Sequence, residues 1–172
     1  MIATGFVQGT EPKPELARQA VQQAMAKINA SVANSVLLFL TPPYARNLPA
    51  TIRAVAAAAN CTHVVGCVAS GVLTEQGSAL KMPAAAAMVL SDELSLQHQA
   101  SGLMLSLATP DDLSTEWLAA DTPRFGGVAH GGVWRNGKGT LVEACDVSLR
   151  GATGAVSVIH GIEYLGEPQP IT

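Results

Sequence analysis

Charged residues are scarce in this chain of 172 residues, in which Asp, Glu, Lys and Arg together make up 13%. Ten basic residues against thirteen acidic ones leave a formal net charge of −3, and the basic residues form no cluster. Proteins that bind nucleic acid or an anionic membrane need a basic patch, so neither is expected as a partner. A surface this poor in charge favours additional burial against a partner or a further domain.

The chain also lacks the usual signs of export, of a membrane span and of a cysteine framework. Its first residues have neither the basic start nor the long apolar run of a secretory signal, and no stretch approaches the roughly 20 apolar residues of a membrane helix. Cys61, Cys67 and Cys145 are odd in number and have no CxxC spacing, which excludes a zinc site or disulfide scaffold of the common kinds. We therefore expect a cytoplasmic protein with reduced cysteines and no metal.

Signatures of catalysis are missing as well. The sequence has no GxSxG elbow, no phosphate-binding loop with its Lys and Ser or Thr, and no HExxH. The adjacent carboxylates Asp111-Asp112 are typical of a helix start. A binding role is therefore expected in place of an enzymatic one.

What the chain does contain is a glycine motif that occurs twice. Residues 66–71 read Gly-Cys-Val-Ala-Ser-Gly, and residues 126–131 read Gly-Gly-Val-Ala-His-Gly. We call these the first and the second glycine motif. Glycines that flank a short apolar pair mark places where something approaches the backbone closely, whether a neighbouring strand or a ligand. The structural interpretation, a bulge or tight corner in a sheet, is about as common as the functional one.

The first sixty residues alternate between strand and helix. Apolar patterning predicts a strand at residues 2–7, a helix at 14–30, a buried strand at 36–40 and a helix at 49–59 between Asn47 and Asn60. The first glycine motif then follows a further strand.

Strands and turns dominate the rest of the chain. We expect strands at residues 84–90, 95–98, 102–108 and 156–161, and a short helix that opens at Thr109-Pro110 and ends before Pro123. The stretch from Val133 to Val142 predicts a hairpin, because its Asn136-Gly137 pair is preferred in type I′ turns. The predicted fold is α+β, a layered sandwich of mixed sheets covered by helices, in a single domain with two pseudo-repeated halves, approximately residues 1–80 and 81–172.

This order of segments resembles the N-terminal half of the FIST domain over nearly the whole chain. The resemblance rests on the apolar strand at residues 36–40, the first glycine motif with its lead-in Val64-Val65, the second glycine motif with its lead-in Phe125, and the stretch 160–172. In the family the last stretch commonly has a Gly-Cys pair, and here Gly161 is followed by Ile162, so any role of that cysteine is lost.

The resemblance implies a sensory domain of bacterial signal transduction with a small ligand, for example an amino acid or a similar metabolite. Its implied partners are a FIST C-terminal half or a signalling protein such as a histidine kinase, and self-association into a homo-oligomer is a further option. The family normally continues into that C-terminal half, which would also account for the low surface charge.

The residues expected at the ligand site come from the two glycine motifs and from the end of the strand 36–40. Ser70 and His130 occupy equivalent places in the two motifs, so together they could bring a hydroxyl and an imidazole to one pocket. Arg46, which follows Tyr44, could bind a carboxylate, because ligands gather beyond the carboxyl ends of parallel strands. The full set is Gly66, Cys67, Ser70, Gly71, Gly126, Gly127, His130, Tyr44 and Arg46.

Three other functions stay open. The first is a haem-binding gas or redox sensor, for which His63, His98, His130 and His160 are the candidate axial ligands. The second is a scaffold or assembly domain without a small ligand. The third is a hydrolase that uses Ser70 or Cys67 with His130, although the sequence identifies no third residue to orient the imidazole.

Overall fold

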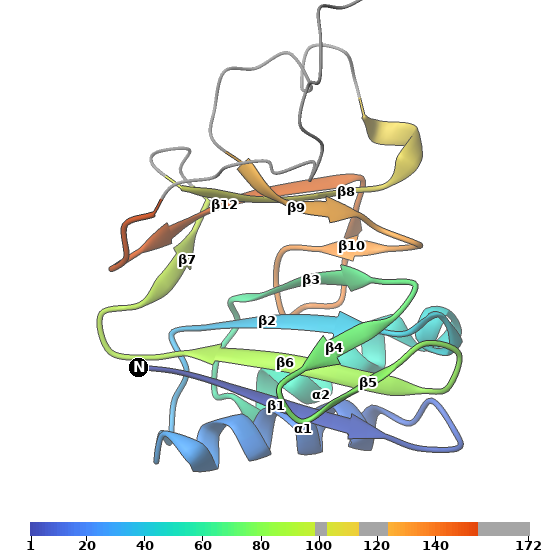
Figure 1. Ribbon diagram of the computed structural model, residues 1–172, viewed down its shortest axis with the longest axis horizontal. Coiled ribbons are helices and arrows are strands. Elements are labelled where there is room, and N and C mark those ends of the chain that lie inside the picture. The colour runs from blue at the N-terminus through green and yellow to red at the C-terminus, as the bar shows by residue number, and fades with distance from the viewer. Residues whose placement is uncertain (99–102, 114–123, 155–172) are drawn as a thin grey trace, which may run out of the picture.

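The computed structural model describes residues 1–98, 103–113 and 124–154 (Figure 1). The elements of the first part are β1 (Ile2–Gln8), α1 (Pro14–Lys27), β2 (Ser35–Leu40), the 3-10 helix η1 (Pro42–Arg46), α2 (Leu48–Ala58) and β3 (Val64–Val68). Next come β4 (Val72–Thr74), β5 (Gly77–Ala79), β6 (Ala84–Leu90), β7 (Ser95–Gln97), β8 (Met104–Ala108) and the 3-10 helix η2 (Pro110–Asp112). The last described elements are β9 (Arg124–Val128), β10 (Val133–Trp134), β11 (Leu141–Val142) and β12 (Ala144–Arg150).

The elements form three layers. The middle layer is a six-stranded sheet in the order β1-β6-β2-β3-β10-β11, in which β2 and β3 are parallel. Helices α1 and α2 cover one face of this sheet, and a four-stranded sheet in the order β7-β12-β8-β9 faces the other (Figure 1). The hairpin β4-β5 forms a separate two-stranded sheet that packs on the same side as the four-stranded one. The predicted α+β sandwich of mixed sheets is confirmed.

Small side chains allow the helices to approach the sheet closely. Ala17, Ala20 and Ala24 of α1 are fully buried, and a Cβ atom on Gly5 of β1 would lie 1.9 Å from the carbonyl oxygen of Ala20. The run of four alanines from Ala84 favours a helix by intrinsic propensity. It is nevertheless a strand, as predicted, because β6 lies between β1 and β2 and is buried on both faces. Tertiary context has overridden propensity here.

The two glycine motifs belong to two backbone units of the same design. In the first unit, β2 is followed by Thr41-Pro42 and pairs in parallel with β3; in the second, β8 is followed by Thr109-Pro110 and pairs in parallel with β9. Gly66 opposes Leu38 and Gly126 opposes Ser106, and in both cases a Cβ atom would lie within 2 Å of the neighbour's carbonyl oxygen. The two glycine motifs therefore occupy equivalent places in two parallel strand pairs of the same design.

A matching hydrogen bond closes each unit. The amide of Ala69 donates to the carbonyl of Leu40 at 2.9 Å, and the equivalent amide of Ala129 donates to that of Ala108 at 2.8 Å. The six-stranded sheet takes strands from both sides of residue 80, since β6, β10 and β11 join β1, β2 and β3.

Several predicted details differ from the structure. Helix α1 ends at Lys27, three residues before the expected end, because the backbone turns left-handed at Asn29 (φ 52°). The hairpin between β10 and β11 exists, but Trp134 pairs with Leu141, so the connection is a six-residue loop and not a type I′ turn at Asn136-Gly137. The positive φ of this loop falls on Gly139 (82°), where Pro49 of α2 leaves no room for a Cβ atom.

Other predicted boundaries hold within a residue or two. Helix α2 ends at Ala58 and Asn60 is left-handed (φ 47°), as expected of its stop residue. Asn47 precedes α2, but it acts through its carbonyl, which accepts the Thr51 hydroxyl, and its side chain makes no cap hydrogen bond. The strand expected at residues 156–161 and most of the helix expected after Pro110 lie outside the described residues. Neither α1 nor α2, the α-helices of the described chain, is long and apolar enough to cross a membrane.

Candidate functional site

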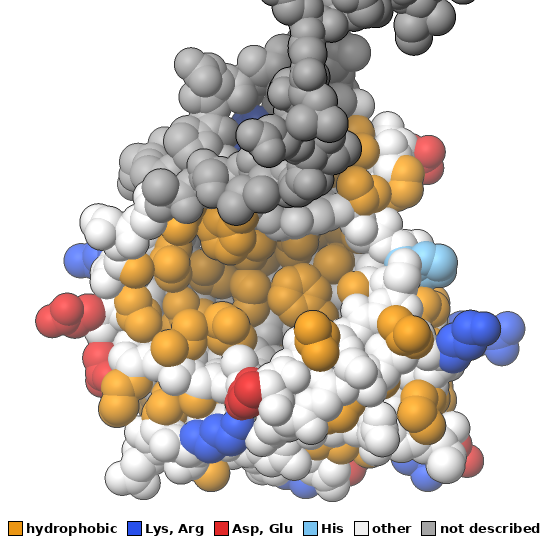
Figure 2. All heavy atoms as spheres, viewed as in Figure 1, with side chains coloured by type: hydrophobic (Ala, Val, Ile, Leu, Met, Phe, Trp, Pro, Cys, Tyr) orange, Lys and Arg blue, Asp and Glu red, His pale blue; other side chains and the backbone are white. Residues whose placement is uncertain are grey.

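A cavity of about 450 Å³ lies between the six-stranded and the four-stranded sheet. We call it the inter-sheet cavity. Figure 2 shows the face on which it opens, hollowed and covered with hydrophobic side chains. The six-stranded sheet and the residue after β3 contribute Ile2, Leu37, Phe39, Cys67, Ala69, Met88 and Leu90, and the four-stranded sheet contributes Leu96, Leu105, Leu107, Phe125, Gly126, Gly127, Val128 and Leu149.

The alternation of side chains along the strands explains this lining. Leu37 and Phe39 of β2 point into the space between the sheets, while Leu38 points to the helices. Leu105 and Leu107 of β8 face them from the other sheet. Both walls of the cavity are therefore formed by apolar side chains of strands that face each other.

The second glycine motif creates the empty space. Val65, Val133 and Val147 fill the layer between the sheets in its interior. Gly126 and Gly127 supply no side chains, and a Cβ atom built on Gly127 would have no heavy atom within 4 Å. The hollow therefore extends along the middle of β9, where Gly126 and Gly127 bring only backbone to the layer.

The two repeat units meet beside this cavity. The amide of His130 donates to the carbonyl of Val68 at 2.8 Å, and the amide of Val68 donates to that of Gly132 at 3.0 Å. These bonds place the Ser70 hydroxyl 3.4 Å from Nδ1 of His130, with both side chains exposed. Ala69, next to Ser70, lines the cavity. The two side chains are therefore adjacent, but neither lines the inter-sheet cavity, so their expected place at the ligand site stays a prediction.

Among the described residues that line the cavity, Cys67 alone has a titratable side chain. It is 3% exposed, and burial raises the pKa of its thiol to about 11. The same cause raises the pKa of Cys145 to about 11, with a smaller contribution from Asp146. Because a thiol with so high a pKa stays protonated at neutral pH, Cys67 contributes a neutral, weakly polar surface and is a poor nucleophile.

Other residues expected at the site lie elsewhere. Tyr44 is fully buried among the helices, its hydroxyl donates to the carbonyl of Lys13 at 3.2 Å, and burial raises its pKa to about 12. Arg46, two residues later in η1, is exposed. A Cβ atom on Gly66 would point at Leu38 and Trp134, and one on Gly71 would point at Leu80. None of these four lines the inter-sheet cavity.

Most lining residues were missed by the sequence reasoning. Leu105 and Leu107 lie in a strand that was predicted, but their common face could be recognised only by applying the two-residue period to that strand. Met88, Leu90 and Leu149 were missed because nothing local in the sequence shows that β6 and β12 face each other across a gap.

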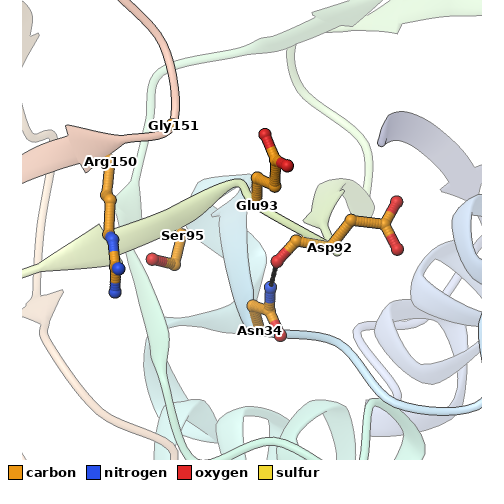
Figure 3. Close-up of a pocket in the computed structure, with 6 residues that line it drawn as sticks. All are labelled: Asn34, Asp92, Glu93, Ser95, Arg150 and Gly151. Atoms are coloured by element: carbon orange, nitrogen blue, oxygen red, sulfur yellow. Dashed lines mark hydrogen bonds between the residues drawn. The ribbon is translucent and has the colours of Figure 1, made fainter.

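A second cavity, of about 810 Å³, is polar (Figure 3). Its lining residues are Asn34, Asp92, Glu93, Ser95, Arg150 and Gly151. Asn34 donates from Nδ2 to the carbonyls of Asp92, at 2.6 Å, and Leu94, at 3.1 Å, so its amide holds the turn between β6 and β7. Figure 3 shows the carboxylates of Asp92 and Glu93 directed away from the Arg150 guanidinium. These charges do not converge on one ligand position.

Metal binding finds no support in the described residues, among which no three His, Cys, Asp or Glu side chains are grouped to hold an ion. His63 and His98 contact each other edge to face, with ring centroids 4.9 Å apart, and neither lines the inter-sheet cavity.

Comparison with known proteins agrees with the repeated architecture. The family model described as FIST N domain matches residues 34–165, which include both glycine motifs and both parallel strand pairs. A search of curated proteins gave no significant match. The chain therefore belongs to the FIST family of sensory domains in signal transduction.

Proposed function

We propose that this domain senses a small molecule that binds in the inter-sheet cavity. One observation carries the proposal: residues of both glycine motifs, Cys67 and Ala69 from the first and Gly126 to Val128 from the second, line a single cavity. The cavity has the size of a small-ligand site, since such sites run from roughly 300 to 1,000 Å³. Small metabolites that present an apolar surface fit this description.

The position of the cavity between two sheets offers a way to transmit ligand binding to a signalling partner. Its walls belong to two different sheets, and the hydrogen bonds of Val68 with Gly132 and His130 join the two repeat units at its side. A ligand that contacts both walls would bind with different affinities to two conformations, one with the sheets closer together and one with them farther apart. A conformational switch requires such a difference in affinity. The recipient of the signal would be a FIST C-terminal half or a partner such as a histidine kinase.

The other candidate functions receive less support. Of the histidines considered as haem ligands, His63, His98 and His130 do not line the cavity, and His160 lies outside the described residues. For a hydrolase, Ser70 and His130 are adjacent, but no described carboxylate hydrogen bonds to His130 to orient its ring. A scaffold without a ligand would leave a cavity of this volume between two sheets unexplained.

Cys67 offers a direct test of occupancy. The purified protein is incubated with a panel of amino acids, small carboxylates, nucleotides and haemin, and its melting temperature is recorded with each. In parallel, a small thiol reagent is added and the modification of each cysteine is followed by mass spectrometry. A ligand at 100 times its dissociation constant stabilises the fold by about 2.7 kcal/mol.

The proposal expects at least one compound both to raise the melting temperature and to slow modification of Cys67. Cys61 is the internal control, because it is partly exposed and lies outside the cavity. A compound that stabilises the protein while leaving the rate at Cys67 unchanged would place the binding site elsewhere and contradict the proposal.

A further inference from the structure

We infer that the molecule held in the inter-sheet cavity is uncharged and apolar, an aromatic or aliphatic compound with at most one hydrogen-bonding group. The inference rests on the proposed function and specifies its ligand. It starts from the lining, in which the described residues contribute leucines, aromatic rings, methionine and glycine but no charged side chain.

A free amino acid does not suit such walls. Its ammonium and carboxylate would each lose their water on entry, and a buried ion is tolerated only where a counter-ion or several hydrogen bonds replace that water. Cys67 cannot serve as a counter-ion, since its thiol is protonated at neutral pH. The charged residues Asp92, Glu93 and Arg150 line the separate polar cavity.

The volume sets the size of the ligand. An engineered apolar cavity of about 150 Å³ stays dry and accepts one benzene molecule. A volume of about 450 Å³ therefore holds a compound with one or two rings or a chain of comparable size. Gly127 presents only backbone to this space, so a flat molecule can lie against β9 without displacing a side chain.

One polar pair lies close to the cavity. The Ser70 hydroxyl and the His130 imidazole are 3.4 Å apart, and Ser70 is adjacent to the lining residue Ala69. Both side chains are exposed and neither lines the cavity, so only a polar group of a ligand that extends out of the apolar interior would meet them. This arrangement accommodates a single neutral polar group.

The test compares two probes that share a phenyl ring. 2-Phenylethanol is neutral, whereas phenylalanine carries both charges of an amino acid. Each is titrated into the full chain by calorimetry, and protection of Cys67 from a thiol reagent is measured in the same samples. We expect 2-phenylethanol to bind and to protect Cys67, and phenylalanine to do neither at tenfold higher concentration.

Variants connect the binding to the cavity. Gly127→Leu places a side chain in the empty space and should weaken binding of 2-phenylethanol at least tenfold, while Gly131→Ala, whose Cβ makes an ordinary 3.5 Å contact with Val68, should not change it. If Gly127→Leu does not fold, Val128→Trp at the exposed margin of the cavity serves the same purpose.

The outcomes separate the two claims. If phenylalanine binds as well as 2-phenylethanol, protects Cys67 and is expelled by Gly127→Leu, the inference on ligand class is overturned and the proposed function stands. If neither probe nor any compound of the wider panel protects Cys67, the site itself is wrong and both claims fail.

Discussion

At the scale of single residues, the glycines of the two motifs have two different structural roles. Gly66 and Gly126 allow a parallel neighbour strand to approach, whereas Gly127 faces open space. The sequence predicted that something approaches these backbones closely, but it could not say which glycine meets a strand and which meets a cavity. That distinction depends on the pairing of β2 with β3 and of β8 with β9, which is a long-range property.

Gly66→Ala should be severely destabilising. The new Cβ atom would lie 1.7 Å from the carbonyl oxygen of Leu38, and neither paired strand can move, because both are buried in the core. We expect a loss of at least about 3 kcal/mol in the free energy of unfolding, measured by urea titration. Gly127→Ala is the matched control, and its effect should stay within about 0.5 kcal/mol; equal losses in the two variants would refute the assignment of roles.

The thiol of Cys67 should react slowly at neutral pH. Burial raises its pKa from 9.0 to about 11, so the reactive thiolate is a minor species until the pH approaches that value. Alkylation by iodoacetamide, followed for Cys67 by mass spectrometry, should accelerate with pH up to about 11. Because the unfolded thiol ionises first, the contribution of Cys67 to stability is complete below pH 9 and is lost between pH 9 and about 11. A rate that levels off near pH 9 would contradict the burial of this side chain.

At the scale of elements, local sequence patterns predicted whether a segment forms a helix or a strand. Contacts with distant parts of the chain determined how strands are connected. The segments of β2, α2 and β6 were predicted within a residue or two, because apolar runs and stop residues are local signals. The strand expected before the first glycine motif, β3, in fact continues into the motif as far as Val68. The type I′ turn was wrong, since packing of Gly139 against Pro49 of α2 draws the connection into a longer loop. Strand β12 was not predicted, although Cys145, Val147 and Leu149 alternate with polar residues in the two-residue period of a strand.

The hairpin β4-β5 is fastened at its tip by a polar cluster. Lys27 of α1 donates to Glu75 at 2.8 Å, and the hydroxyl of Thr4 of β1 donates to the same carboxylate. The hydrogen bond from Lys27 is the main reason why the pKa of Glu75 falls to about 2. Lys27 also donates to the carbonyl of Thr4, on the side of β1 that has no partner strand. One lysine thus holds the hairpin and covers a sheet edge.

Glu75→Gln should loosen this hairpin. The folded-state pKa of Glu75 is depressed, so its contribution to stability is present above the unfolded pKa of about 4.5 and is lost as the pH falls toward 2. We expect a small decrease in the urea midpoint at pH 7 that disappears near pH 2, together with faster hydrogen exchange in residues 72–79. The exposed carboxylate of Glu93, changed to Gln, is the control. A pH-independent difference between wild type and Glu75→Gln would assign the effect to packing.

At the scale of the whole molecule, the repeat and the cavity are consequences of one arrangement. Two parallel strand pairs of similar design are placed in different sheets, and the sheets face each other with β3 and β9 on opposite walls. The sequence showed the repeated motif and the equivalent places of Ser70 and His130 in its two copies. It could not show the cavity, because that depends on which side chains are absent from the layer between the sheets.

A domain that keeps an open apolar hollow between its sheets gives up stability that a larger side chain would restore. Filling the space from Gly127 removes apolar surface from water, at about 0.8 kcal/mol for each buried methylene group. We therefore expect Gly127→Leu to raise the free energy of unfolding by about 1 to 2 kcal/mol, measured by urea titration, while Gly131→Ala changes it little. The same variant should respond least to any ligand that stabilises the wild type, because stability and binding compete for one volume. A Gly127→Leu protein that is destabilised, or that responds to ligand like the wild type, would show that this space is not available for binding.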